Sequence, residues 1–232
     1  MSILGKVSSL RAVGFDLDGT LFDHRGSATA AADGFLAEFG VVPADHAREL
    51  WFAAEEHEFE RWRAGDIGFQ QQRRNRVTTV FGALGLDIPD TSEGLDRLFD
   101  RYLAAYRTAW RLFPDSGDVL RRLRLRGVGI GILTNGTQEQ QREKLERTGL
   151  VDLVDAVCVS EEIGVQKPDS RAFDIFAERL GAAADACHFI GDNPDHDVAG
   201  ARDAGMSASL IERYRPGAPG LLEIVEGAVG WL

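Results

Sequence analysis

The chain has 232 residues and a formal net charge of -11 at pH 7. This length suffices for a domain with a sizeable core plus an insertion, whereas the excess of acidic residues opposes binding to the nucleic-acid backbone. No apolar run approaches the roughly 20 residues that span a bilayer, and the opening residues lack the pattern of a secretory signal. We therefore expect a cytoplasmic protein, monomeric or homodimeric, that binds neither nucleic acid nor a membrane.

The first predicted element is a strand at 12–18, AVGFDLD, which contains Asp16 and Asp18. Two like-charged carboxylates at the edge of a core repel each other and lose hydration, which raises a carboxylate pKa unless a cation compensates. Side chains alternate along a strand, so these two can point the same way. A metal ion or a reaction explains the pair, and a surface turn is the alternative.

Long amphipathic stretches of helical period follow the first strand. They predict an all-helical insertion over residues 24–112, which divides a core domain formed by 1–23 and 113–232. This insertion is rich in arginine and aromatic residues. We interpret the arginines as solvated and the aromatic residues as part of a core.

Short apolar segments alternate with helical segments from about residue 115 onward, and the apolar ones predict strands at 127–135, 155–161, 187–193 and 206–212. This alternation predicts an α/β fold with a Rossmann-like parallel sheet covered by helices on both faces. Cys158 and Cys187 lie in two of these strands, and we interpret them as small apolar core residues.

Two further acidic residues lie near the end of the predicted strand at 187–193. Asp192 is at the end of this strand, and Asp197 is in the first turn of the predicted helix that follows. Ligands of open α/β sheets bind at the carboxyl ends of the strands. Together with Asp16 and Asp18, these residues offer the hard oxygen ligands that Mg²⁺ prefers. For Asp197, stabilisation by the helix dipole is the alternative.

Two further segments predict contacts with an anion. Thr134 and Asn135 lie where a strand gives way to a helix, a place where backbone N–H groups hold phosphate, although either residue can also cap the helix. Lys167 precedes Pro168, which disfavours helix at the lysine, and a compact ammonium can bridge an anion and a carboxylate. The alternative for Lys167 is a solvated loop lysine, in a chain that has only three lysines.

Taken together and in this order, DLDGT, LTNG, QKPD and GDNPDHD resemble the motifs of the haloacid dehalogenase (HAD) superfamily. The resemblance covers residues 10–30 and 112–212, and the insertion resembles the helical cap of the branch that includes phosphoglycolate phosphatase, β-phosphoglucomutase and the dehalogenases. It implies a HAD-like core and a Mg²⁺-dependent phosphatase. Such an enzyme hydrolyses a small phosphorylated metabolite through an aspartyl-phosphate intermediate.

The resemblance also implies a role for each motif residue. The nucleophile would be Asp16 and the proton carrier Asp18, with Lys167 as the third catalytic residue. The phosphate-binding residues would be Thr134, Asn135 and Lys167. The Mg²⁺ ligands would be Asp16, Asp18 through its carbonyl, Asp192 and Asp197.

The sequence distinguishes the phosphatase from other activities of the superfamily to different degrees. A phosphomutase of the β-phosphoglucomutase type uses the same pair of aspartates. The dehalogenases lack the second acid of the first motif, so Asp18 disfavours a 2-haloacid dehalogenase. Asp18 and Lys167 together also count against a non-catalytic binding protein. Residues 133–169 resemble N-acylneuraminate-9-phosphatase and pyrimidine nucleotidases, which favours a sugar phosphate or a nucleoside monophosphate as substrate.

Overall fold

The computed structural model describes residues 10–230 of the chain, which divides into two compact units. The core unit comprises Met1–His24 and Arg111–Leu232, and the helical unit comprises Arg25–Trp110. Within residues 10–230, no helix combines the length and the apolar character that crossing a membrane requires.

The core unit contains a parallel sheet with the strand order β3-β2-β1-β4-β5. Its strands are β1 (Ala12–Phe15), β2 (Gly129–Thr134), β3 (Ala156–Val159), β4 (Cys187–Gly191) and β5 (Ser207–Leu210). The predicted α/β fold is therefore confirmed. The observed strands are shorter than the predicted ones because several of the polar residues assigned to their ends lie in the loops that follow.

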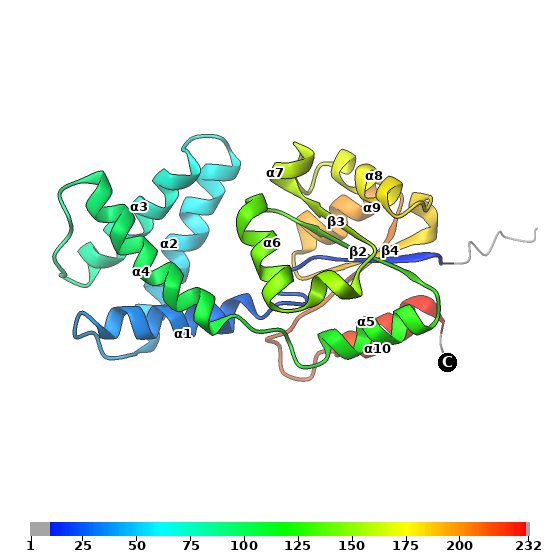
Figure 1. The fold of residues 1–232 in the computed structure, drawn as a ribbon, viewed down its shortest axis with the longest axis horizontal. Coiled ribbons are helices and arrows are strands. Elements are labelled where there is room, and N and C mark those ends of the chain that lie inside the picture. Colours follow the sequence, from blue (N-terminus) through cyan, green and yellow to red (C-terminus); the bar gives the residue numbers. More distant parts are fainter. Residues whose placement is uncertain (1–9, 231–232) are drawn as a thin grey trace, which may run out of the picture. The chain divides into compact units, whose positions relative to one another are not determined.

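Helices cover both faces of the sheet (Figure 1). One face carries α5 (Ser116–Leu125) and α10 (Leu221–Val229), and the other carries α8 (Ser170–Arg179) and α9 (Gly200–Asp203). The remaining elements of the core unit are α6 (Gln138–Arg147), η1 (Leu150–Leu153), α7 (Ser160–Ile163), η2 (Ala184–Ala186) and the π-helical turn η3 (Pro194–Ala199).

Glycines in the central strands let α8 pack closely on the sheet. Gly14 and Gly131 are paired across β1 and β2, and a Cβ atom at either position would overlap the ring of Phe176 on α8. Both strand cysteines are buried and unpaired, which confirms that they serve as small core residues. The centre of the sheet is therefore rigidly packed, and it holds the strand ends in fixed positions.

The helical unit is built from α1 (His24–Ala37), α2 (Asp45–Arg63), α3 (Phe69–Ala83) and α4 (Ser92–Ala109). Its core contains the fully buried aromatic side chains of Phe35, Trp51 and Phe81. Arg76 is buried beside the Trp51 ring and pairs with Glu55. The aromatic residues are thus core, as predicted, but Arg76 departs from the expected solvated face because its charge has a buried partner.

His188 on β4 provides a test of pH-dependent stability. Its Nδ1 lies 2.7 Å from the Ser207 hydroxyl and its Nε2 lies 2.9 Å from the Ser209 hydroxyl. Burial, assisted by the positive charge of Arg202, lowers the pKa of His188 to about 4. Since an unfolded histidine takes up its proton near pH 6.5, we expect acidification from pH 6.5 to 4 to lower the free energy of unfolding, by up to about 3 kcal/mol through this group.

Urea unfolding of the wild type and of His188→Gln at pH 7 and pH 4.5 measures this contribution. The variant lacks a group that titrates in this window, so it should lose less stability on acidification than the wild type. Equal losses in the two proteins would show that His188 does not supply the effect.

Candidate active site

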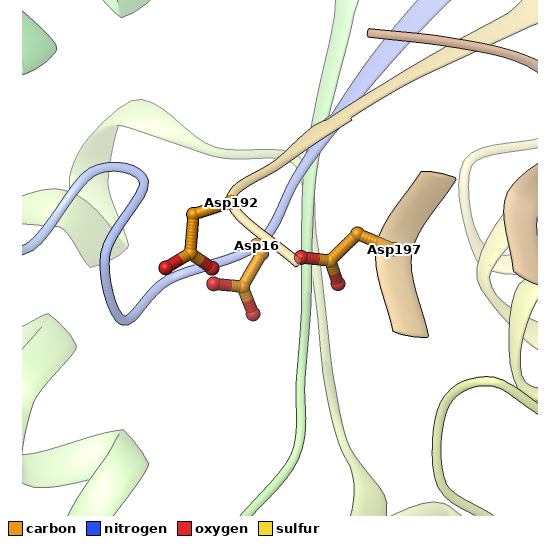
Figure 2. Close-up of side chains that lie close together, drawn as sticks. All are labelled: Asp16, Asp192 and Asp197. Atoms are coloured by element: carbon orange, nitrogen blue, oxygen red, sulfur yellow. The ribbon is translucent and has the colours of Figure 1, made fainter. Parts of the chain in front are cut away.

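Three aspartates gather at the carboxyl ends of two neighbouring strands. Asp16 directly follows β1, Asp192 directly follows β4, and Asp197 lies in η3. The register pairs Phe15 with Ile190, so the residues that follow these strands leave the sheet side by side. One oxygen from each of the three carboxylates lies within 4.8 Å of the others (Figure 2). Sequence-distant acids that were predicted to converge are thus brought together.

Lys167 joins this cluster from the loop between α7 and α8. Its Nζ donates hydrogen bonds to Asp16 Oδ1 at 2.7 Å and to Asp197 Oδ1 at 2.6 Å. The side chain is only 3% exposed, so the alternative of a solvated loop lysine is wrong. Burial opposes the charge on Lys167, but the charges of Asp16 and Asp197 outweigh it and raise the pKa of the lysine.

The single positive charge of Lys167 does not compensate the negative charges of the three aspartates. Burial raises the pKa of Asp16 well above its ordinary value, and the charges of Asp197 and Asp192 reinforce the effect while Lys167 opposes it. Asp192 lies at the open side of the cluster. Although Asp192 is exposed on that side, partial desolvation of its carboxylate together with the charge of Asp197 raises its pKa to about 6. A divalent cation would relieve the repulsion and favour the ionised forms of Asp16 and Asp192.

Two glycines make room for these carboxylates. A Cβ atom at Gly19 would overlap the Asp192 carboxylate, and one at Gly191 would overlap the Asp197 carboxylate. Gly19 also has a φ of 84°, a conformation that favours glycine. The donor set consists of hard carboxylate oxygens, so Asp16, Asp192 and Asp197 fit a Mg²⁺ ion chemically.

Asp18 stands apart from the acidic cluster. Lys144 Nζ lies 2.6 Å from its Oδ1 and 2.8 Å from its Oδ2, and Gln141 Nε2 donates to Oδ2 at 2.9 Å. Burial tends to raise the pKa of Asp18, but the charges of Lys144 and His24 and these hydrogen bonds outweigh it and lower the pKa. The side chain therefore faces α6, and coordination of a metal by the Asp18 carbonyl stays a prediction.

Thr134 and Asn135, the predicted phosphate-binding residues, are positioned by the Gln141 side chain and by the Lys167 backbone, respectively. Thr134 ends β2, is buried, and accepts a hydrogen bond from Gln141 Nε2 at 2.7 Å. The Asn135 side chain donates to the Lys167 carbonyl at 2.9 Å and accepts from the Lys167 N–H at 2.9 Å. The side chain of Asn135 thus holds the Lys167 loop against the end of β2. The group of Asn135 that can contact a phosphate is therefore its backbone N–H.

The start of α6 is less open than the sequence predicts. The Gly136 N–H donates to the Ser160 hydroxyl at 3.0 Å, and the Gln138 N–H donates to Glu161 Oε2 at 2.7 Å. These two N–H groups therefore have partners in α7, which directly follows β3, and the binding of phosphate by the Asn135 backbone stays a prediction. Gln141 and Lys144, by contrast, are site residues that the sequence reasoning missed. Their spacing of three on a predicted helix and the rarity of lysine in this chain were signals that could have singled them out.

Comparisons with known proteins place this geometry in context. Residues 10–205 match the family model of the haloacid dehalogenase-like hydrolases. The chain is 34% identical to ribulose-1,5-bisphosphate 5-phosphatase of Halopiger xanaduensis, over 87% of this chain and 84% of that protein. It is 31% identical to glyceraldehyde 3-phosphate phosphatase of Methanothermobacter thermautotrophicus, over 87% of this chain and 85% of that protein.

Solved structures show the same fold. The HAD-hydrolase YfnB from Bacillus subtilis, solved with magnesium, superposes with a TM-score of 0.75 at 20% identity, covering 94% of this chain and 98% of that one. A structure described as a dehalogenase superposes with a TM-score of 0.70 at 27% identity, covering 94% and 91% of the two chains.

Proposed function

Because the chain belongs to the haloacid dehalogenase-like hydrolases, we propose that it is a Mg²⁺-dependent phosphatase that hydrolyses a small phosphate monoester through an aspartyl-phosphate intermediate. The observation that carries this proposal is the buried contact of Lys167 Nζ with the Asp16 carboxylate, 2.7 Å away, beside two further acids. A carboxylate placed next to a cation can approach an anionic phosphate and act as a nucleophile.

In the first step, an Asp16 oxygen attacks phosphorus while the bond from phosphorus to the leaving oxygen breaks. Asp18 donates its proton to that oxygen. The dianionic substrate raises the pKa of Asp18 when it binds, which is the direction that the acid role requires. Thr134 and the Asn135 backbone hold the transferring phosphoryl oxygens, and Lys167 neutralises part of their charge.

In the second step, water attacks phosphorus and the bond from Asp16 to phosphorus breaks, which restores the Asp16 carboxylate. Asp18, deprotonated by the first step, takes the proton of the attacking water. Asp16, Asp192 and Asp197 would hold the Mg²⁺ ion, with the Asp18 carbonyl as a further ligand. When bound, the ion supplies positive charge that lets the carboxylate and the phosphate come together.

The relatives support a phosphorylated sugar or a similar small metabolite as substrate, since two of them are named as phosphatases of ribulose-1,5-bisphosphate and glyceraldehyde 3-phosphate. A structure described as a dehalogenase is also similar to this chain. Asp18 nevertheless favours phosphate chemistry, because the dehalogenases lack the second acid of the first motif. A phosphomutase would use the same residues and is the second candidate. The assignment of residues 24–112 as a cap domain also stays a prediction.

A panel of sugar phosphates, nucleoside monophosphates and other small phosphate monoesters, assayed with Mg²⁺ and with EDTA, tests the proposal. We expect release of inorganic phosphate from some members of the panel with Mg²⁺ and its loss with EDTA, because the acidic cluster needs a compensating cation. An isomerised sugar phosphate without free phosphate would instead indicate a phosphomutase. Absence of turnover across the panel would contradict the proposed activity.

A further inference from the structure

Lys144 is a buried cation placed against one acid of the first motif. It is only 1% exposed, and its Nζ lies 2.6 and 2.8 Å from the two oxygens of Asp18, a residue 126 positions earlier in the chain. Its Nζ also lies 4.9 Å from the centre of the Phe22 ring. Lysine is almost never buried unless it is paired. Here the Asp18 carboxylate supplies the opposite charge that allows Lys144 to be buried.

Gln141 lies on the same face of α6, three residues before Lys144. Its Nε2 faces three acceptors: Thr134 Oγ1 at 2.7 Å, Asp18 Oδ2 at 2.9 Å and the Asn135 carbonyl at 3.3 Å. A carboxylate and a carbonyl only accept hydrogen bonds, so the amide nitrogen must be the atom that faces them. One amide therefore links the proton carrier of the first motif with the hydroxyl at the end of β2.

These contacts determine which hydrogen-bonding sites of Asp18 and Thr134 a substrate can use. A carboxylate has about four acceptor sites, and the two contacts from Lys144 and the one from Gln141 use three of them. Counting these contacts within the described part of the chain, one site of Asp18 remains to carry a proton. The Thr134 oxygen accepts from Gln141, so its own hydrogen points away from that amide and can be donated to a phosphoryl oxygen.

We propose that Lys144 and Gln141 are positioning residues, which hold the Asp18 carboxylate in one orientation for proton transfer, and that Gln141 also orients the Thr134 hydroxyl. This inference rests on the proposed phosphatase function. Neither residue touches the reacting atoms, and each acts through a residue that does. Lys144 acts through the proton carrier, whereas Gln141 acts through the proton carrier and the phosphate-binding hydroxyl together.

The two roles predict different kinetic effects, which leaving groups can separate. An alkyl leaving oxygen needs a proton from Asp18, whereas a p-nitrophenolate leaves without one. We measure kcat/KM, which reports the steps up to loss of the leaving group, on p-nitrophenyl phosphate and on the best alkyl phosphate of the panel. Lys144→Met should lower the alkyl value by about 10- to 100-fold and the p-nitrophenyl value by at most a few-fold. Gln141→Leu should lower both by about 10-fold, because it also loosens Thr134.

A double-variant cycle distinguishes positioning from a merely structural role. Lys144→Met should have little further effect in an Asp18→Asn background, because the group it positions is already gone. This double variant also removes both charges of the buried pair, so it stays informative if Lys144→Met alone folds poorly. Arg147→Met is the matched control, since Arg147 lies on the same helix, is 47% exposed and pairs with Glu143 at the surface.

Each outcome bears on a different statement. A wild type that hydrolyses neither substrate contradicts the proposed function. An active wild type with a Lys144→Met variant that loses the same factor on both substrates, or the same factor again in the Asp18→Asn background, overturns the positioning role of Lys144. A Gln141→Leu variant with wild-type kcat/KM on both substrates overturns the role of Gln141.

Discussion

Replacement of Asp16 by asparagine should abolish phosphate release, with a loss of about 10⁴-fold or more. The carboxamide is neutral and cannot form the aspartyl-phosphate, whereas its shape is almost that of the carboxylate. Lys167 keeps its second partner, Asp197, 2.6 Å away, so the buried lysine remains paired and the fold should persist. The measurement is phosphate release with Mg²⁺ on the best substrate of the panel, with circular dichroism to show that the variant is folded.

Asp195→Asn is the matched control for this change. Asp195 is exposed and lies two residues before Asp197, so the same loss of one carboxylate there should leave activity within about twofold, as for most exposed positions. Mass spectrometry of acid-quenched reactions should find one added phosphoryl group on the peptide that contains Asp16. An Asp16→Asn enzyme that retains a tenth of the wild-type activity would contradict the assignment of the nucleophile.

Most of the sheet could be predicted because its strands are short, apolar and followed by polar residues. The same regularity predicted the convergence of Asp16 and Asp192, since each directly follows a strand of the sheet. The place of Lys167 beside them was implied by the family resemblance. Chain order and strand polarity are enough for this inference, and no knowledge of side-chain rotamers is needed. The acidic cluster is therefore the part of the site that the sequence describes best.

The surroundings of Asp18 could not be predicted in the same way. Helical periodicity shows that Gln141 and Lys144 share a face of α6, but it does not show which segment that face contacts. Their pairing with Asp18 spans 123 and 126 residues, and it depends on how α6 packs. The partners of the Gly136 and Gln138 N–H groups could not be predicted for a related reason, because Ser160 and Glu161 lie in α7, directly after another strand.

Lys167→Met should be the second most damaging change to activity. The methionine occupies a similar volume but leaves the buried carboxylates of Asp16 and Asp197 without the ammonium that lies 2.7 and 2.6 Å from them. Loss of that cation raises the pKa of Asp16 further, so less nucleophile is ionised at neutral pH. It also removes charge that stabilises the transferring phosphoryl group. We expect kcat/KM to fall by about 10²- to 10³-fold.

The same variant should lose about 3–5 kcal/mol of stability in EDTA, because removal of one partner leaves buried charge uncompensated. Lys167→Met/Asp197→Asn removes the excess negative charge and keeps an acceptor for the Asn193 N–H, which donates to Asp197 Oδ2 at 3.0 Å. This double variant should recover stability but not activity. The surface variant Arg171→Met, at the start of α8 and with a side chain that is 74% exposed, should change neither quantity.

The comparison of these three variants separates folding from chemistry. If activity returned together with stability in the double variant, Lys167 would matter only for holding the acids in place. If Lys167→Met kept kcat/KM within threefold of the wild type, the lysine would have no part in the reaction. Since Asp197 is itself a proposed Mg²⁺ ligand, the reference for the double variant is Asp197→Asn alone. A double variant that is stable but clearly less active than Asp197→Asn shows that the ammonium acts on the phosphoryl group or on the ionisation of Asp16, which its contact with Asp16 assigns to it.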